Sequence, residues 1–462
     1  MPTLLWFRRD LRVHDHPALL EAAREAAADG DGRVLPLFVL DPAVWDPAGP
    51  VRRAYLLRSL AALRADLGGT LLVRAGDPSA VVPAVAADSG AGSVHISADF
   101  GPYGSARDLR VEAGLAGDGR RLVRTGSPYA VAPGRVTKDD GTAFRVYTPF
   151  FKAWLRHGWR APAPDPDPAP TWWSPRDGDP LPDEPDLGDL VLPPAGEAAA
   201  YARWDAFRAT GLAAYADDRN RPDLPSTSAL GHHLKWGEIH PRTLLAELGD
   251  TPGEEVFRKE LAWREFYADV LAQRPESARH SLDERFVAMT WDAGTAADEA
   301  LEAWAAGRTG YPFVDAGMRQ LRAEGWMHNR LRMVVASFLV KDLHLPWQRG
   351  ARHFLHWLRD GDLASNSHGW QWTAGSGTDA APYHRIFNPV TQGLRFDPDG
   401  DYVRRYVPEL RHLPGAAAHE PWDAADGYAH GYPPRLVDHA VERTVALARL
   451  DAVKGDPARR TG

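Results

Sequence analysis

The sequence predicts two domains of different class: an N-terminal α/β domain with a doubly wound parallel sheet, and a large all-α C-terminal domain. In the first 160 residues, short apolar runs alternate with amphipathic helical patterns, which is typical of a parallel sheet covered by helices on both faces. Beyond residue 198 the pattern is helical almost to the end of the chain. We therefore place the α/β domain at residues 1–160, a linker at 161–197 and the helical domain at 198–462.

Five apolar runs in the first domain have the length and the boundaries of buried strands. They are TLLWF (3–7), RVLPLFVLD (33–41), TLLVRAG (70–76), SVHISAD (93–99) and RRLVRTGS (120–127). Segments 16–30 and 52–69 have helical periodicity and end at glycine. Ligands of such sheets bind at the carboxyl ends of the strands, which is where Asp41 and Asp99 fall.

The linker is rich in proline and aspartate, so we expect it to contain little regular structure. Its adjacent Trp172 and Trp173 are expected to anchor it to a domain surface. Residues 165–189 contain eight acidic side chains and one arginine, which account for −7 of the chain's net charge of −8. The rest of the chain is therefore almost neutral, and the total charge does not exclude a nucleic-acid partner.

The composition excludes several other classes of protein and site. The chain has no cysteine, which rules out disulfides, cysteine-based zinc sites and cysteine nucleophiles. It has no apolar stretch of roughly 18 residues and no HExxH-type spacing, so we expect neither a membrane span nor a metal site. Charged residues begin at Arg8, too early for a signal peptide, and we expect a cytoplasmic monomer. The 17 tryptophans indicate either an aromatic core or surfaces for stacking and electron transfer.

The helical domain contains clear amphipathic segments at 256–274, 313–326, 329–345 and 350–362. One face of the first segment carries Phe257, Glu260, Arg264 and Tyr267, with Trp263 beside Glu260. Periodicity alone favours an ordinary amphipathic helix with a surface ion pair. The alternative is that this face forms the wall of a pocket.

Two helix starts carry polar groups that have both a structural and a functional interpretation. Asn329, Arg332 and Met333 share one face of a helix whose later residues are apolar, so they either line an internal cavity or belong to a plain capped helix. The hydroxyl cluster at Ser226, Thr227 and Ser228 precedes another helical run. It predicts either an anion site or, more commonly, a simple N-cap.

The stretch DGDLASNSHGWQW (360–372) combines two carboxylates, an amide and two tryptophans. Asp362 and Asn366 are spaced for one helical face. Buried carboxylates need cationic or hydrogen-bonding partners, and Arg332 is one candidate for Asp360. A nucleotide cofactor, with ring N–H groups and ribose hydroxyls, would also satisfy them.

Together these segments resemble the DNA photolyase/cryptochrome family, most closely its class I cyclobutane pyrimidine dimer photolyases. The resemblance rests on LLWFRRDLRVHDHPAL (4–19), TGYPFVDAGMRQL (309–321), GWMHNRLRM (325–333), DGDLASN (360–366) and GTDAAPYHRIFNP (377–389). It covers most of the chain outside the linker. It implies an α/β antenna domain, a helical domain that holds FAD, and light-driven repair of cyclobutane pyrimidine dimers in DNA.

The same resemblance implies a set of FAD contacts. Asn366 matches the residue that faces flavin N5, and Arg332 matches the arginine that pairs with Asp360. The full set is Tyr215, Thr227, Ser228, Ala229, Leu230, Gly231, Phe257, Arg264, Arg332, Asp360, Gly361, Asp362 and Asn366. Gly231 stands where the family has a serine, and Phe257 where tryptophan or glutamine is more usual. We expect FAD binding to survive both departures.

The resemblance also implies residues for electron transfer and for the lesion. Trp370 would lie nearest the flavin, followed by Trp347 and then Trp291 toward the surface. The lesion pocket would be lined by Glu260, Trp263, Asn329, Met333 and Trp372. Contacts to DNA phosphates are expected from Arg219, Arg330 and Arg385.

For the α/β domain the resemblance implies a second, light-harvesting chromophore. Asp41, Arg52 and Asp99 match positions that contact a deazaflavin-type antenna. We favour 8-hydroxy-deazaflavin, and a folate, another flavin or no chromophore remain the alternatives.

Three other functions compete with dimer repair. A cryptochrome-type blue-light receptor is disfavoured by Asn366, where plant-type cryptochromes tend to have aspartate and animal-type ones cysteine, and we expect no long tail after the last helix. A (6–4) photolyase is disfavoured by Trp263 and Met333. A flavoprotein that acts in the dark would need a nicotinamide site, and no GxGxxG follows a predicted strand.

Overall fold

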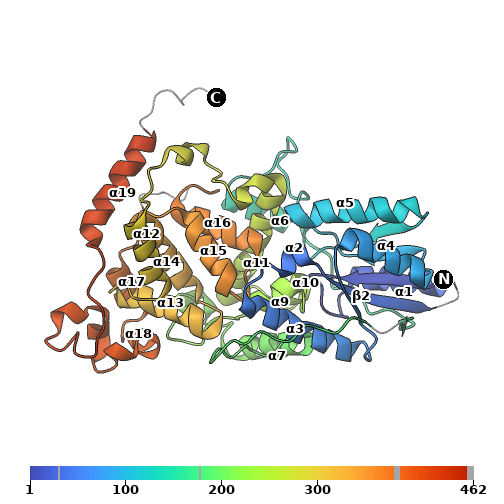
Figure 1. Ribbon diagram of the computed structural model, residues 1–462, viewed down its shortest axis with the longest axis horizontal. Helices are drawn as coiled ribbons and strands as arrows, with labels where there is room; N and C mark the ends of the chain where they lie inside the picture. Colours follow the sequence, from blue (N-terminus) through green and yellow to red (C-terminus); the bar gives the residue numbers. More distant parts are fainter. Residues whose placement is uncertain (30–31, 176–177, 379–384, 455–462) are drawn as a thin grey trace.

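The N-terminal part of the computed structural model is a parallel sheet with helices on both faces (Figure 1). The structure describes residues 1–29, 32–175, 178–378 and 385–454. The main strands lie in the order β3-β2-β1-β4-β5, which confirms the predicted doubly wound α/β fold. Their bounds are β1 Thr3–Phe7, β2 Arg33–Leu40, β3 Leu72–Ala75, β4 Ser93–Ile96 and β5 Arg121–Arg124.

Both faces of the sheet are buried, because alternate side chains of each strand point to opposite cores. In β1, Leu5 and Phe7 join one core, whereas Leu4 and Trp6 join the other. Helices α1 and α3 cover the first face, and α4 and α5 cover the second. The helices of this part are α1 Pro17–Ala28, α2 Pro42–Trp45, α3 Pro50–Asp66, α4 Pro78–Ser89, α5 Pro102–Gly117 and α6 Tyr147–His157.

The linker contributes a sixth strand, although its composition predicts little regular structure. β6 (Thr171–Trp172) pairs in parallel with the first two residues of β2. β3 pairs only with Leu37–Leu40 at the other end of β2, so this edge is free to accept a strand. Trp172 packs in one core of the sheet and Trp173 in the other, as successive side chains of a strand must. The two tryptophans therefore attach the linker to both faces.

From residue 197 onward the described chain is helical and contains no strand, as the sequence predicts. The α-helices are α7 Glu197–Thr210, α8 Tyr215–Asp218, α9 Gly231–Trp236, α10 Pro241–Ala246, α11 Pro252–Gln273, α12 Thr295–Ala305, α13 Pro312–Glu324, α14 Asn329–Lys341, α15 Trp347–Trp357, α16 Leu363–Ala374, α17 Pro389–Phe396, α18 Asp401–Tyr406 and α19 His439–Lys454. Short 3-10 helices lie at η1 Pro275–Ala278, η2 Glu284–Ala288, η3 Pro408–Leu410, η4 Gly415–His419 and η5 Pro421–Asp423.

Two large apolar cores hold the helical domain. One packs α13, α14, α15 and α16 around residues such as Leu331, Phe338 and Trp370. The other joins α7 and α11 to α6, through Trp154 of α6 and Phe266 of α11. Helix α6 precedes the linker in sequence but belongs to this second core. One wall of the helical domain is thus built from the first 160 residues.

The segment that follows β1 fastens the two halves of the molecule together. The buried guanidinium of Arg12 donates to the carbonyl of Gly237, and Asp15 forms an ion pair of 2.5 Å with Arg242. Glu197 accepts hydrogen bonds from the backbone N–H groups of Val13 and His14. In Figure 1 the two halves consequently lie side by side, with the sheet and its covering helices to the right and helices of the C-terminal half, such as α12–α15 and α19, to the left. None of the described helices is long and apolar enough to cross a membrane.

Candidate functional site

A cavity of about 420 Å³ opens between α11, α14 and α16, and a second of about 270 Å³ adjoins it toward α8 and α9. The two cavities share Glu260, Arg264, Arg332, Asp360 and Asp362 as lining residues. The DGDLASN stretch (360–366), whose carboxylates and amide were predicted to need cationic or cofactor partners, lies where the two cavities meet. Asp362 caps α16 by accepting the N–H of Ser365 at 3.1 Å, and this cap sets where the helix begins.

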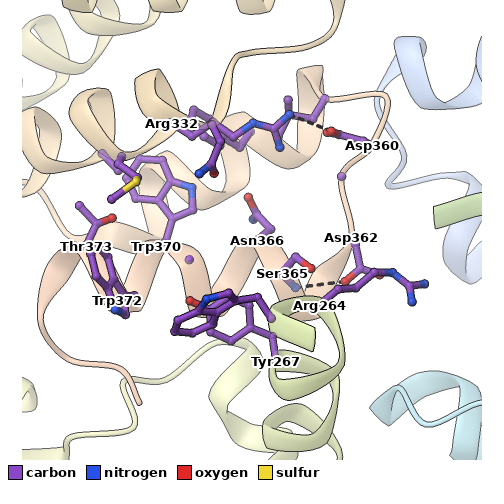
Figure 2. A pocket seen from close by; sticks show the side chains of 18 of the residues that line it. Arg264, Tyr267, Arg332, Asp360, Asp362, Ser365, Asn366, Trp370, Trp372 and Thr373 are labelled. Atoms are coloured by element: carbon purple, nitrogen blue, oxygen red, sulfur yellow. Dashed lines mark hydrogen bonds and ion pairs between the residues drawn. The ribbon is translucent and has the colours of Figure 1, made fainter. Parts of the chain in front are cut away.

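Arg332 and Asp360 face each other across one side of the cavity, with Asn366 below them (Figure 2). The guanidinium Nη2 of Arg332 lies 2.8 Å from Asp360 Oδ2, while Nε donates to the carbonyl of Met327. The second oxygen of Asp360, Oδ1, is buried without a hydrogen-bond partner. Asn366 donates from Nδ2 to the carbonyl of Ala351 at 3.0 Å. Its amide is therefore held in one orientation in the cavity wall.

Asp362 is held by an arginine from the other half of the molecule. Nη2 of Arg9, in the segment after β1, lies 2.6 Å from Asp362 Oδ2. Burial by itself raises the pKa of Asp362, but the positive charges of Arg9 and Arg264 hold it below its usual range. Sequence reasoning did not single out Arg9, although it follows the carboxyl end of a strand, where the fold rule expects ligands. Asp362 therefore stays ionised in the cavity wall.

The outer wall of the cavity contains the five residues expected to bind the lesion: Glu260, Trp263, Asn329, Met333 and Trp372. Glu260 forms an ion pair of 2.7 Å with Arg219, and both side chains keep partial contact with solvent. Burial raises the pKa of the Glu260 carboxyl, and the charge of Arg219 acts in the opposite direction. Asn329 is exposed, and the other four are partly buried.

The second cavity is lined by Tyr215, Phe257 and the segment Thr227–Gly231. Arg203 donates to the carbonyls of Thr227 and Ser228 at 2.7 and 2.6 Å and so fixes the path of this segment, a role that the sequence did not suggest. A Cβ atom on Gly231 would lie 2.8 Å from Asp360 Oδ2. A side chain at this position would therefore require the Asp360 carboxylate to shift.

Phe257 has mainly a packing role in the structure. It is 3% exposed and stacks against Trp204 with ring centroids 5.3 Å apart. It also meets the ring edge of Tyr215 at 5.7 Å. Its aromatic face belongs to the core between α7 and α11, and only part of the side chain reaches the cavity.

Comparison with known proteins identifies the family. Residues 3–170 match the family model described as "DNA photolyase", and residues 257–452 match "FAD binding domain of DNA photolyase". The chain belongs to the DNA photolyase family. A deoxyribodipyrimidine photo-lyase of Halobacterium salinarum is 41% identical, over 98% of this chain and 99% of that protein.

Solved structures of the family agree with this placement. The crystal structure of a bacterial class III photolyase from Agrobacterium tumefaciens superposes with a TM-score of 0.88 at 36% identity, over 98% of both chains. An archaeal photolyase from Sulfolobus tokodaii, solved with two FAD molecules, gives a TM-score of 0.81 at 26% identity. It covers 98% of this chain and 100% of that one.

The three tryptophans that the family resemblance links to electron transfer lie in or against the same core. Trp370 and Trp347 are each 2% exposed, and Trp291 packs against the core from its surface. Trp370 Nε1 is buried without a partner, whereas Trp347 Nε1 donates to Ser281 Oγ at 3.1 Å. A side chain on Gly350 would collide with the Trp370 ring, so glycine is required where α15 crosses α16.

The expected antenna residues fall into two groups. Asp41 accepts a hydrogen bond from Tyr103 at 2.5 Å, and Asp99 pairs with Arg107 at 3.3 Å, both at the carboxyl edge of the sheet. Arg52 lies instead on α3 beside Gly361, at the boundary with the helical domain. Burial lowers the pKa of Arg52 to about 10.

Lys235, on α9 and not singled out from the sequence, lies near Arg52. Burial, together with the charges of Arg9 and Arg52, lowers the pKa of Lys235 to about 7. Two cations at the domain boundary are thus held in an environment that disfavours their charge.

At the rim of the cavity, Arg330 donates to Asn220 Oδ1 at 2.7 Å and lies over the ring of Phe396. Burial and the nearby charges of Arg219 and Arg395 lower the pKa of Arg330 to about 10. Arg385 is exposed. It follows residues 379–384 of the GTDAAPYHRIFNP motif, which lie outside the described part of the chain. No group of three His, Asp or Glu residues in the described chain could hold a metal ion.

Proposed function

We propose that the protein repairs cyclobutane pyrimidine dimers in DNA, using light and bound FAD. The observation that carries this proposal is that a single cavity has two walls of different character. Buried polar groups suited to a nucleotide cofactor lie opposite the partly exposed residues Glu260, Trp263, Asn329, Met333 and Trp372. The names of the relatives, deoxyribodipyrimidine photo-lyases, support the same activity.

The inner wall of the cavity is the side formed by Arg264, Arg332, Asp360, Asp362, Asn366 and Trp370. Its hydrogen-bonding groups suit FAD. Asp360 Oδ1 is a buried acceptor without a donor, and Trp370 Nε1 is a buried donor without an acceptor, and both residues line the cavity. Buried polar atoms in native proteins almost always have partners, so a bound group rich in N–H, hydroxyl and carbonyl functions is expected here. When bound, FAD supplies a photoexcitable electron donor.

The residues proposed to hold FAD divide by cavity. Asp360, Gly361, Asp362, Asn366, Arg264 and Arg332 would bind the ring and the ribose. Tyr215, Phe257 and the backbone of Thr227–Gly231 would enclose the phosphates. Arg332 orients the Asp360 carboxylate, and Arg9 orients Asp362 and helps to keep its carboxylate ionised.

The outer wall would bind a dimer that has left the DNA stack. A dimer already disturbs pairing and stacking, which lowers the cost of flipping it out. Trp263 and Trp372 offer aromatic faces for stacking, while Glu260 and Asn329 offer hydrogen bonds to base edges. Arg219 would contact a phosphate as well as Glu260, because its guanidinium has more donors than one carboxylate uses.

Arginines around the cavity mouth would bind the DNA backbone. We assign Arg219, Arg330 and Arg385 to phosphate contacts, and we add Arg395 because its charge lowers the pKa of the nearby Arg330. Phosphate contacts set position and affinity, whereas the lesion pocket supplies discrimination.

Trp370, Trp347 and Trp291 would carry electrons from the surface to the cofactor. Indole rings are readily oxidised. Trp370 is buried, Trp347 is hydrogen-bonded and Trp291 is partly exposed, so the three rings in this order would lead outward. This path serves reduction of the cofactor and is separate from repair.

For the antenna we propose an anionic chromophore, with 8-hydroxy-deazaflavin favoured. Arg52 and Lys235 are two cations whose pKa values burial lowers, and a bound anion would offset that cost. A folate, or a second FAD like that in the archaeal relative, is the alternative. Adding each chromophore to the protein and measuring energy transfer to FAD would decide among them. Lys235→Met should weaken binding of an anionic chromophore.

The decisive experiment illuminates the purified protein, with its FAD reduced, in the presence of an oligonucleotide that contains one cyclobutane dimer. Reappearance of intact pyrimidines, followed by their absorbance, is expected under blue light and not in the dark. Repair of a (6–4) oligonucleotide instead would reassign the substrate. Repair of neither would favour a light-receptor role. The resemblance to class I stays a prediction, since one close structural relative is described as class III.

A further inference from the structure

Trp263 does not stand alone in the lesion wall but lies flat on a second aromatic ring. Its indole and the phenol of Tyr147 stack with centroids 3.6 Å apart and planes 8° from parallel. Tyr147 is 8% exposed and is the first residue of α6, whereas Trp263 is partly exposed and lines the cavity. Tyr147 therefore covers one face of the indole from behind and leaves the cavity side open.

The same tyrosine is fixed to the helix that carries the lesion residues. Its hydroxyl donates to the carbonyl of Lys259 at 2.8 Å. Lys259 precedes Glu260 and lies one helical turn before Trp263 on α11. Tyr147 thus contacts the one helical turn that carries two of the proposed lesion-binding residues, Glu260 and Trp263. Burial, together with the carboxylate of Glu260, raises the pKa of Tyr147, so its hydroxyl stays a donor.

We propose that Tyr147 is a positioning residue for dimer recognition, which holds the Trp263 indole in the orientation that stacks on the extruded pyrimidines. The inference rests on the proposed function, in which Trp263 contacts the dimer. Tyr147 itself lies behind Trp263 and touches no DNA. Its contribution is to remove the rotational freedom of the indole before binding, which lowers the entropic cost of forming the complex.

Three variants separate this role from simple packing. Tyr147→Leu removes the ring stack, and Tyr147→Phe keeps the stack but removes the hydrogen bond to Lys259. Phe151→Leu is the matched control, because Phe151 stacks on Tyr147 at 5.8 Å and 18° but is not in ring contact with Trp263. If Tyr147→Leu does not fold, Tyr147→Met serves as a second variant without an aromatic ring.

Affinity is measured for DNA with one dimer and for the same undamaged DNA. Tyr147→Leu should weaken dimer binding about fivefold and leave undamaged DNA unchanged. Tyr147→Phe should stay within about twofold of the parent protein, because the ring pair survives. Phe151→Leu should leave the ratio of the two affinities unchanged. The FAD content and the visible spectrum should be the same in all variants.

Two results would overturn the inference. One is an unchanged ratio of affinities in Tyr147→Leu or Tyr147→Met. The other is an equal loss of ratio in Phe151→Leu, which would indicate general loosening of the α6–α11 contact. Trp263→Ala separates this inference from the proposed function. If Trp263→Ala binds dimers normally, the lesion wall itself is wrong. If it binds them weakly while Tyr147→Leu does not, only the role of Tyr147 fails.

A double variant adds a check that a purely structural role would not satisfy. In the Trp263→Ala background, Tyr147→Leu should produce no further loss of dimer affinity, because the ring that Tyr147 orients is gone. Additive losses would contradict the proposed coupling between the two rings.

Discussion

The inner and the outer wall of the cavity differ in how far their polar groups are exposed to solvent. On the inner wall the side chains of Asp360 and Asp362 are 8% and 13% exposed, and each has an arginine within 2.8 Å. On the outer wall Glu260 also has an arginine, Arg219 at 2.7 Å, but its carboxylate is more exposed, at 30%, and Asn329 lies open to solvent. Buried charges are tolerated only with fixed partners, and half-exposed groups can exchange water for a ligand. The inner wall is therefore suited to a resident group, and the outer wall to one that comes and goes.

The largest effect should come from a residue that belongs to neither wall. Trp347→Phe keeps the ring packing but replaces an oxidisable indole with a ring that is much harder to oxidise. Light-driven reduction of oxidised FAD should be almost lost. The same variant, reduced chemically beforehand, should repair dimers normally, because in the proposed repair the electron would come from the flavin and return to it.

Flavin absorbance under continuous illumination measures the first property, and dimer repair in single turnover measures the second. Photoreduction at the parent rate would show that the tryptophan assignment is wrong. Loss of repair in the pre-reduced variant would reveal a structural role for Trp347.

Among the cavity variants, Asp360→Ala should show most clearly that FAD binding and dimer binding depend on different walls. It leaves the partly buried Arg332 charge without its carboxylate and removes an acceptor proposed for FAD. The free energy of FAD binding should fall by about 3 kcal/mol. FAD fluorescence on titration into the apoprotein gives this value.

Dimer affinity measured on the residual FAD-loaded fraction of Asp360→Ala should be close to normal. Asp186→Ala, an exposed linker residue, is the control for a lost surface charge. An equal loss of FAD and dimer affinity would argue that the walls are not independent.

Salt should weaken DNA binding at the arginine-rich rim of the cavity and leave FAD binding at the inner wall almost unchanged. Contacts of about four arginines with phosphates predict that the logarithm of DNA affinity falls with the logarithm of salt concentration with a slope of about −3.6. Arg395→Gln should reduce the steepness by about 1. A salt series with dimer-containing DNA tests both values. A flat response would mean that the basic rim inferred for an acidic chain does not bind DNA.

Trp263→Ala should have the smallest effect and the reverse pattern of Asp360→Ala. Loss of one base–aromatic stack should weaken dimer binding by about 1–3 kcal/mol. FAD content and photoreduction should be unchanged, since the indole is proposed to face the substrate and not the cofactor. Equilibrium binding of damaged and undamaged DNA provides the measurement. A loss of FAD in this variant would show that Trp263 belongs to the inner wall and contradict its assignment to the outer one.

The sequence predicted the fold class and the residues that line the cavity better than it predicted which of these side chains pair with one another. Helical periodicity and the DGDLASN motif located Asp360, Asp362 and Asn366, because these features depend on neighbours along the chain. The partner of Asp362 could not be found in that way. Arg9 is 353 positions away, and no local pattern encodes which strand end meets which helix start.

Similar limits explain the other omissions. Arg203 acts on backbone carbonyls of Thr227 and Ser228, so its role leaves no mark in side-chain spacing. Tyr147 comes from a helix that precedes the linker but packs in the helical core. β6 forms because β3 leaves part of β2 unpaired, a property of the assembled sheet and not of the proline-rich segment itself.

The Arg9–Asp362 ion pair has a consequence for the modularity of this architecture. A carboxylate at the centre of the helical half receives its countercharge from the α/β half. If the helical half were produced alone, Asp362 would be left in a partly buried site without Arg9, and its ionised form would lose stabilisation. An α/β half exchanged from another protein would have to bring an arginine at the same place after its first strand. At this point of contact the two halves are therefore expected to tolerate exchange only as a matched pair.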